Sequence, residues 1–118
     1  MPEKNYPAYR QQLRSLMGRL GRELPGPVAA MGQLHTQAMG EGALSGKTKE
    51  LIALGIAVSA RCEGCLAYHV YNCLEEGATR AEIVETLGVG IAMGGGPSAV
   101  YACEAFQALE QYLAAKEG

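Results

Sequence analysis

Two cysteines, a histidine and a glutamate are spaced so that they could form one redox site. Cys62 and Cys65 are separated by two residues, Glu50 lies twelve positions before Cys62, and His69 lies four positions after Cys65. Two cysteines three positions apart on a helix lie on one face and can close a disulfide without moving the chain. A thiol in the first turn of a helix lies among unpaired N–H groups that favour its thiolate. Either thiol could attack an electrophilic oxygen or sulfur, and the other could resolve the product.

The histidine and the glutamate would supply proton transfer. If a helix begins near Cys62, then Cys65 and His69 are i, i+4 neighbours, and the imidazole points back over the sulfur atoms. Glu50 precedes an apolar run, residues 51–58, which we expect to be a mostly buried helix. A carboxylate at the start of that helix would be close to the site yet poorly solvated. We therefore expect Glu50 to act as a base and His69 as a proton relay.

This constellation resembles the alkylhydroperoxidase AhpD-like proteins of the carboxymuconolactone decarboxylase superfamily. Their motif is Glu, eleven residues, Cys, two residues, Cys, three residues, His, and Glu50, Cys62, Cys65 and His69 match it. The resemblance runs from about residue 44 to residue 113 and includes the segments 47–54 and 94–97. Some members carry a second histidine between the two cysteines, where this chain has Glu63 and Gly64.

The resemblance implies a fold, an assembly and a role for each cysteine. We expect an all-α, compact helical domain of about five to six helices, AhpD-like and oligomeric, with a trimer or hexamer as the assembly. The resemblance also implies that peroxide attacks at Cys65 (the peroxidatic cysteine) and that Cys62 resolves. Position alone points the other way, because the helix dipole favours the thiolate of the cysteine nearest the N-terminus, which is Cys62.

The activity that the resemblance implies is that of a thiol-dependent peroxidase or disulfide reductase in antioxidant defence. Cys65 would reduce a hydroperoxide and become a sulfenic acid, with which Cys62 would condense to a disulfide. No bound cofactor is expected. Regeneration would need an external dithiol, such as a lipoyl-bearing or thioredoxin-like protein, and a peroxiredoxin is a further expected partner. The alternatives are a carboxymuconolactone decarboxylase-type lyase, which has no need of the cysteine pair, and a non-enzymatic redox-sensing oligomer.

Zinc binding is the competing use of these residue types. Cys62, Cys65, His69 and Cys73 are all possible ligands, but eleven residues of helix separate Cys62 from Cys73 by about 16 Å. Tetrahedral ligands must all approach within about 2.0–2.3 Å of one ion, so one helix cannot supply all four. A metal on the two motif cysteines would need partners such as His69 or Glu50. We therefore favour a catalytic dithiol and expect no metal.

Length and composition limit the other classes of function. The chain has 118 residues, 48% of them apolar, and fits a single AhpD-like domain over residues 1–118. Its net charge of −2 provides no positive electrostatic field that would attract nucleic acid or an anionic membrane. The N-terminus lacks a secretory signal pattern, and the longest apolar stretch is well short of the ~20 residues that span a bilayer. We expect a cytoplasmic protein that binds neither nucleic acid nor membrane.

Helical periodicity runs through nearly the whole chain. Apolar stripes predict helices over residues 9–20, 28–38, 83–91 and 100–113, and the cysteine helix should run from Cys62 to Glu76. Ser45 is the expected N-cap of the helix that carries Glu50, and Thr79 begins a capping box. Turns are expected at four places: residues 25–27, 40–42, 77 and 94–96.

The remaining polar and sulfur-containing residues have ordinary structural explanations. Cys73 and Cys103 are expected to be small core residues, since free cysteine is among the most buried residue types. His35 has no partner motif, so we expect a satisfied or exposed histidine. Tyr68 is expected either to line a substrate pocket or to be an interface or core aromatic.

Glycine is abundant for a helical protein, at 16 of 118 residues. Gly55, Gly88 and Gly90 lie inside apolar helical segments, where each costs about 1 kcal/mol relative to alanine. Close helix–helix approach, within or between subunits, is the expected compensation. The same glycines and the long apolar stripes lead us to expect interfaces at the glycine-rich and C-terminal helices.

Overall fold

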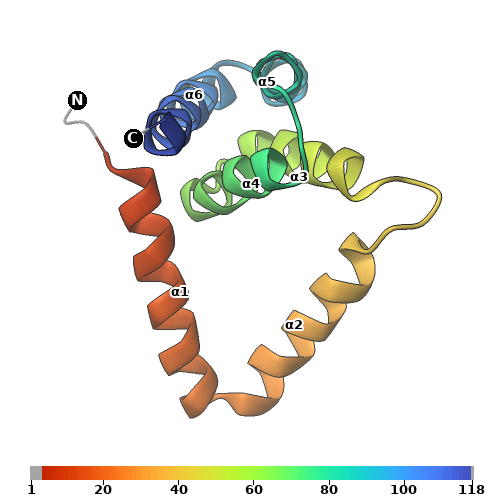
Figure 1. The fold of residues 1–118 in the computed structure, drawn as a ribbon, viewed down its shortest axis with the longest axis vertical. Helices are drawn as coiled ribbons and strands as arrows, with labels where there is room; N and C mark the ends of the chain where they lie inside the picture. Colours follow the sequence, from red (N-terminus) through yellow and green to blue (C-terminus); the bar gives the residue numbers. More distant parts are fainter. Residues whose placement is uncertain (1–3, 118) are drawn as a thin grey trace.

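The computed structural model describes residues 4–117, in which all regular structure is helical. The helices are α1 (Tyr6–Glu23), α2 (Pro25–Met39), α3 (Gly46–Ala60), α4 (Glu63–Glu75), α5 (Arg80–Gly94) and α6 (Gly96–Glu117). Helices α3 to α6 form a bundle, and α1 and α2 extend from it as the two arms of a V (Figure 1). The prediction of an all-α chain of five to six helices is confirmed. Within residues 4–117, no helix has both the length and the apolar character needed to cross a membrane.

The starts of α3 and α5 follow local capping signals. The Ser45 hydroxyl accepts a hydrogen bond from the Thr48 N–H at 3.1 Å, which makes Ser45 the N-cap of α3. Thr79 accepts from the Glu82 N–H at 3.1 Å, and the Glu82 carboxylate accepts from the Thr79 N–H at 2.8 Å. Both predicted helix starts are therefore confirmed, because the side chains satisfy N–H groups that a helix leaves unpaired.

Glycine and proline set the turns between helices. Gly77 (φ 89°) follows α4, and Gly95 (φ 76°) separates α5 from α6, in backbone conformations that other residues rarely adopt. The turn expected at residues 25–27 is shorter than predicted. Pro25 is already the first residue of α2, a position where its missing N–H costs nothing.

Close packing of α3 on α5 explains one of the helical glycines directly. A Cβ built on Gly90 would lie 2.8 Å from the Cβ of Val58, so only glycine permits this approach of the two helices. At Gly55 an added Cβ would make an ordinary contact, 3.7 Å from Thr86. At Gly88 it would meet no atom within 4 Å, so the expected close approach is wrong for Gly88 within one chain.

The C-terminal helix buries a different face from the predicted one. The buried side chains of α6 include three alanines together with Leu109 and Tyr112. Val100 and Phe106 are 53% and 40% exposed, and Cys103 is exposed, so the prediction of Cys103 as a core residue is wrong. The small alanine side chains let this face of α6 pack closely against the neighbouring helices. The larger apolar side chains, Val100 and Phe106, are on other faces of α6 and remain exposed.

Several apolar stripes on the first three helices are also exposed. Leu16, Met17 and Leu20 of α1 are each more than 40% exposed, and α2 buries no residue. In α3, Ile52 and Ile56 are exposed, so the run 51–58 is only half buried instead of mostly buried. The reason is geometric: α1 and α2 diverge from the bundle, and one side of α3 lies at its surface (Figure 1).

Candidate functional site

A tight turn between α3 and α4 places the two motif cysteines. Arg61 has a left-handed backbone (φ 58°, ψ 50°), and its N–H bonds to the carbonyls of Ala57 and Val58. The Cys62 N–H then bonds to the Ala57 carbonyl at 3.1 Å, and α4 begins at Glu63. Cys62 is therefore the N-cap of the cysteine helix and not its first residue, one position from the predicted start.

The two sulfurs lie together at the N-terminus of α4. Cys62 and Cys65 are joined in a disulfide with an S–S distance of 2.19 Å and a Cα–Cα distance of 5.2 Å. The Cys65 N–H donates to the Cys62 Sγ at 3.2 Å. In the reduced protein this N–H and the helix dipole would both stabilise negative charge on Cys62.

A histidine one turn further along α4 pairs with a buried carboxylate on α3. The Nδ1 of His69 is 2.8 Å from Oε1 of Glu50, and their side chains are only 14% and 11% exposed. With Glu50 ionised, Nδ1 must carry the proton and donate it, which leaves Nε2 as the free nitrogen. Glu50 therefore lies close to the cysteine helix and is poorly solvated. His69 and Cys65, four positions apart on α4, share a helix face.

A third cysteine lies beside this pair but is held protonated. Cys73 is four residues beyond His69 and fully buried. Burial, and after it the negative charge of Glu50, raises the pKa of the Cys73 thiol to about 12. The prediction of Cys73 as a small core residue is therefore confirmed. Among residues 4–117, no group of three or more His, Cys, Asp or Glu side chains is arranged to hold a metal ion.

Glu63, one of the two residues between the cysteines, belongs to a polar cluster at the edge of the site. Glu63 lies 3.0 Å from the Nζ of Lys4, which also donates to Glu104 at 2.7 Å. The Tyr6 hydroxyl donates to the same Glu104 oxygen at 2.8 Å. Burial acts to raise the pKa of Glu104, but the hydrogen bonds from Lys4 and Tyr6 outweigh it, so this pKa is lowered. The cluster fastens the N-terminal segment to α6 and to the start of α4.

Tyr68 lies near α1. The Arg10 guanidinium lies 3.6 Å from the centre of the Tyr71 ring and 5.7 Å from that of Tyr68. Tyr68 therefore contributes to the contact between α1 and α4. A role for it in a substrate pocket stays a prediction.

Sequence reasoning missed one neighbour of the site. The His35 ring, from α2, lies 6.1 Å from the His69 ring, centre to centre, with an interplanar angle of 31°. His35 is exposed, as expected. No spacing rule could connect it with His69, because the two residues are on helices whose relative placement depends on the tertiary fold.

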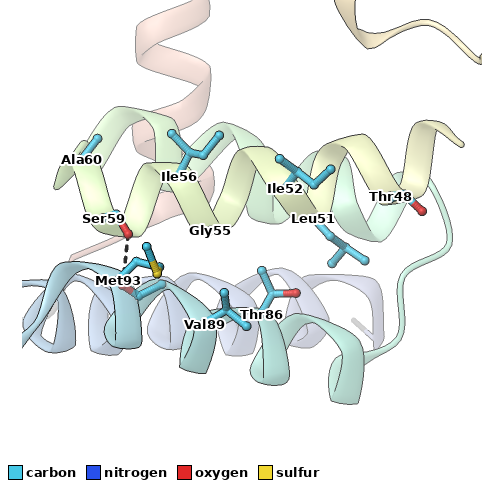
Figure 2. A pocket seen from close by; sticks show the side chains of 11 residues that line it. Thr48, Leu51, Ile52, Gly55, Ile56, Ser59, Ala60, Thr86, Val89 and Met93 are labelled. Carbon is cyan, nitrogen blue, oxygen red and sulfur yellow. Dashed lines mark hydrogen bonds between the residues drawn. The ribbon is translucent and has the colours of Figure 1, made fainter. Parts of the chain in front are cut away.

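An open apolar groove lies elsewhere, between α3 and α5 (Figure 2). It has a volume of about 700 Å³, and none of its lining residues is a cysteine, histidine or glutamate. Ile56 (62% exposed), Val89 (61%) and Met93 (79%) contribute its most exposed apolar side chains. Ser59 also lines the groove, and its hydroxyl donates to the Gly90 carbonyl at 3.0 Å. The groove is an apolar surface separate from the dithiol.

Comparisons with known proteins agree with this arrangement of helices. The sequence pattern of the carboxymuconolactone decarboxylase family matches residues 25–108. An uncharacterized protein of Cupriavidus necator is 36% identical over 94 residues, which cover 80% of this chain and 83% of that protein. The crystal structure of a carboxymuconolactone decarboxylase family protein from Legionella pneumophila superposes with a TM-score of 0.88 at 36% identity, covering 93% of this chain and 98% of that one.

A second solved structure adds a functional suggestion. It is a carboxymuconolactone decarboxylase family protein from Thermotoga maritima, for which an involvement in the antioxidative response has been suggested. It superposes with a TM-score of 0.82 at 28% identity and covers 93% of both chains.

Proposed function

This chain belongs to the carboxymuconolactone decarboxylase family, and we propose that it is a thiol-dependent peroxidase and disulfide reductase within it. The observation that carries the proposal is the disulfide of Cys62 and Cys65 at the start of α4, one turn from the hydrogen-bonded pair of His69 and Glu50. Decarboxylation of a lactone acid has no need of two adjacent thiols. The suggested antioxidative role of the Thermotoga maritima relative supports the same choice.

The first step reduces a hydroperoxide at Cys65. His69 accepts the thiol proton, and the thiolate attacks the terminal oxygen of the hydroperoxide, so that an S–O bond forms as the O–O bond breaks. The leaving alkoxide takes the proton and departs as an alcohol, and Cys65 becomes a sulfenic acid. Glu50 stabilises the imidazolium that forms and orients it through the bond to Nδ1.

The second step closes the disulfide. The Cys62 sulfur attacks the Cys65 sulfur, the S–S bond forms, the S–O bond breaks, and water leaves. The disulfide in the structure is the state that follows this step. An external dithiol then reduces it by exchange and becomes a disulfide itself; a lipoyl-bearing or thioredoxin-like protein has the required chemistry. A peroxiredoxin disulfide could be reduced by the same dithiol.

The distance along the helix supports Cys65 as the attacked thiol. His69 is four residues from Cys65, about 6 Å along the axis, but seven from Cys62, about 10.5 Å. The neighbouring base therefore favours Cys65, whereas the cap hydrogen bond favours negative charge on Cys62. In the proposed cycle the two effects act in turn: the base activates Cys65, and the cap stabilises Cys62 as the sulfur that resolves.

We also propose that the chain forms a homo-oligomer, as a trimer or a hexamer, through contact with further copies of itself. The groove between α3 and α5 and the unburied α2 leave large apolar side chains in water. Exposed apolar surface on this scale is typical of subunit interfaces. Covering it would compensate for the apolar stripes that the single chain leaves exposed.

Turnover with a chemical dithiol tests the proposal. The protein, supplied with dithiothreitol and an alkyl hydroperoxide, should produce one alcohol for each dithiothreitol oxidised. Cys65→Ser should abolish this turnover. Cys62→Ser, treated with the hydroperoxide in the absence of dithiothreitol, should stop at the sulfenic acid, which a dimedone adduct on Cys65 would reveal. Cys103→Ser is the matched control and should be fully active, since Cys103 is on the exposed face of α6. Turnover that survives Cys65→Ser would refute the proposed reaction.

A further inference from the structure

His35 and His69 bring two imidazole rings together from helices that are distant in sequence. His35 is on α2 and His69 is on α4, and their ring centres are 6.1 Å apart with an interplanar angle of 31°. Rings at this separation can exchange a proton through one intervening water, and closer approach of two nitrogens permits direct transfer. Imidazole is also the side chain whose ordinary pKa lies nearest neutral pH, which suits it to carry protons in both directions.

The two rings differ in their access to solvent. The His69 side chain is 14% exposed, and its Nδ1 is engaged by Glu50, whose side chain is 11% exposed. His35, by contrast, is exposed. A proton released from the pair of His69 and Glu50 therefore has the exposed imidazole of His35, on α2, as a neighbouring acceptor.

The position of His35 is anchored at the end of its helix. The Lys49 ammonium group donates to the carbonyls of Ala38 and Gly40, at 2.9 and 2.6 Å, and so ties the C-terminal end of α2 to α3. Lys49 directly precedes Glu50, so the same turn of α3 holds the carboxylate and fastens α2. His35 lies one turn before Ala38 on the fastened end, which keeps its ring near His69.

We propose that His35 transfers protons between solvent and His69 during the dithiol–disulfide cycle. The proposal rests on the proposed redox function of Cys62 and Cys65. In the reductive half, an external dithiol breaks the S–S bond, and the two cysteine sulfurs take up the protons that the dithiol loses. His69 delivers a proton to Cys65 and is reprotonated by His35. In the oxidative half, the proton that thiolate formation places on His69 can pass to solvent by the same route, and a proton returns along it to the leaving alkoxide.

Chemical rescue separates proton transfer from a structural role. The rate of disulfide reduction by dithiothreitol would be measured at low buffer concentration for the wild type, His35→Ala, His35→Gln and Gln37→Ala. Gln37 is an exposed polar residue on the same helix, two positions on, and serves as the matched control. Circular dichroism would check that all four proteins have the same helix content.

The proposal expects both His35 variants to be slower than wild type by about fivefold or more, and expects added imidazole to restore His35→Ala at constant pH and ionic strength. Gln37→Ala should keep the wild-type rate. A wild-type rate in His35→Ala, or in His35→Gln, which retains polarity but cannot titrate, would overturn the proposal. A slowed His35→Ala that imidazole does not restore would also overturn it, since that result indicates a structural effect.

The peroxidase assignment and the proton route through His35 can be tested separately. If the wild type does not reduce hydroperoxides, but the dithiothreitol step still depends on His35 and is rescued by imidazole, the peroxidase assignment is wrong and the proton route stands. If hydroperoxides are reduced at the wild-type rate by His35→Ala at low buffer concentration, the proton route is wrong and the peroxidase stands.

Discussion

The Nδ1 atom of His69 lies 2.8 Å from Oε1 of Glu50, so a hydrogen bond joins α4 to α3 one turn beyond the disulfide. The two side chains are nearly enclosed. The bond fixes which ring nitrogen faces the carboxylate, and it leaves the other nitrogen for exchange with Cys65 or His35. Proton transfer in the proposed cycle therefore depends on this pair.

Removing either member of the pair should slow disulfide formation without unfolding the protein. Glu50→Gln and His69→Phe are expected to lower the rate of hydroperoxide-driven disulfide formation by about tenfold or more, because general acid–base catalysis contributes about 10²–10⁴. Stopped-flow thiol oxidation measures the rate, and circular dichroism measures helix content. Glu110→Gln, in an exposed ion pair with Arg80, is the control. If the thiolate absorbance curve against pH were unchanged in both variants, the relay would be refuted.

The contact between α3 and α5 should respond oppositely to alanine at two nearby glycines. Gly90→Ala places a Cβ 2.8 Å from the Cβ of Val58, and such overpacking costs about 1–3 kcal/mol. Gly88→Ala meets no atom within 4 Å and should stabilise the helix by up to about 1 kcal/mol. Urea unfolding at one protein concentration measures both. Equal effects of the two substitutions would contradict the packing.

Stability should fall in acid through Glu104. Because the folded-state pKa of Glu104 is lowered, its contribution is fully present above the ordinary glutamate pKa of about 4.3 and is lost as the pH falls through the lowered value. Glu104→Gln should be less stable than wild type at neutral pH and should lose less stability on acidification. Urea unfolding at a series of pH values gives both curves. Parallel curves would show that Glu104 titrates normally in the folded protein.

The chain should be an oligomer in solution. Ile56, Val89 and Met93 are exposed in the groove between α3 and α5, and a charge there should weaken subunit contact. Light scattering at micromolar concentration should give a trimer or hexamer mass for the wild type and a smaller mass for Met93→Asp. A wild-type mass near 12.4 kDa would mean that the single chain tolerates its exposed apolar surface.

Local signals were enough to predict where α3 and α5 begin. Ser45 and Thr79 cap α3 and α5 through hydrogen bonds that span three residues, so the sequence contains all of the interaction. The faces of the helices were harder to predict. Cys103 and Phe106 belong to an apolar stripe but lie outward, because periodicity identifies an apolar face without showing which surface covers it.

Some residues of the candidate site could likewise be predicted from local sequence, and others could not. Glu50, Cys62, Cys65 and His69 are joined by a two-residue connection between α3 and α4, so fixed spacing is sufficient to bring them together. His35 reaches His69 only because the C-terminal end of α2 returns to the bundle, where Lys49 holds it to α3, and nothing in its local sequence indicates that path. Two local effects compete to decide which sulfur reacts first: the neighbouring histidine favours Cys65, and the cap hydrogen bond favours Cys62. The spacing of the residues does not show which effect is stronger.

A thiol count with peptide mapping tests the central claim most directly. The fully reduced protein has four thiols per chain. One equivalent of alkyl hydroperoxide should leave two, with one equivalent of alcohol released. Cleavage after Arg61 and Arg80 gives a single peptide that contains Cys62, Cys65 and Cys73. Mass spectrometry after alkylation should find the bridge between Cys62 and Cys65, with Cys73 alkylated. Four remaining thiols, or a bridge to Cys73 or Cys103, would contradict the proposed dithiol function.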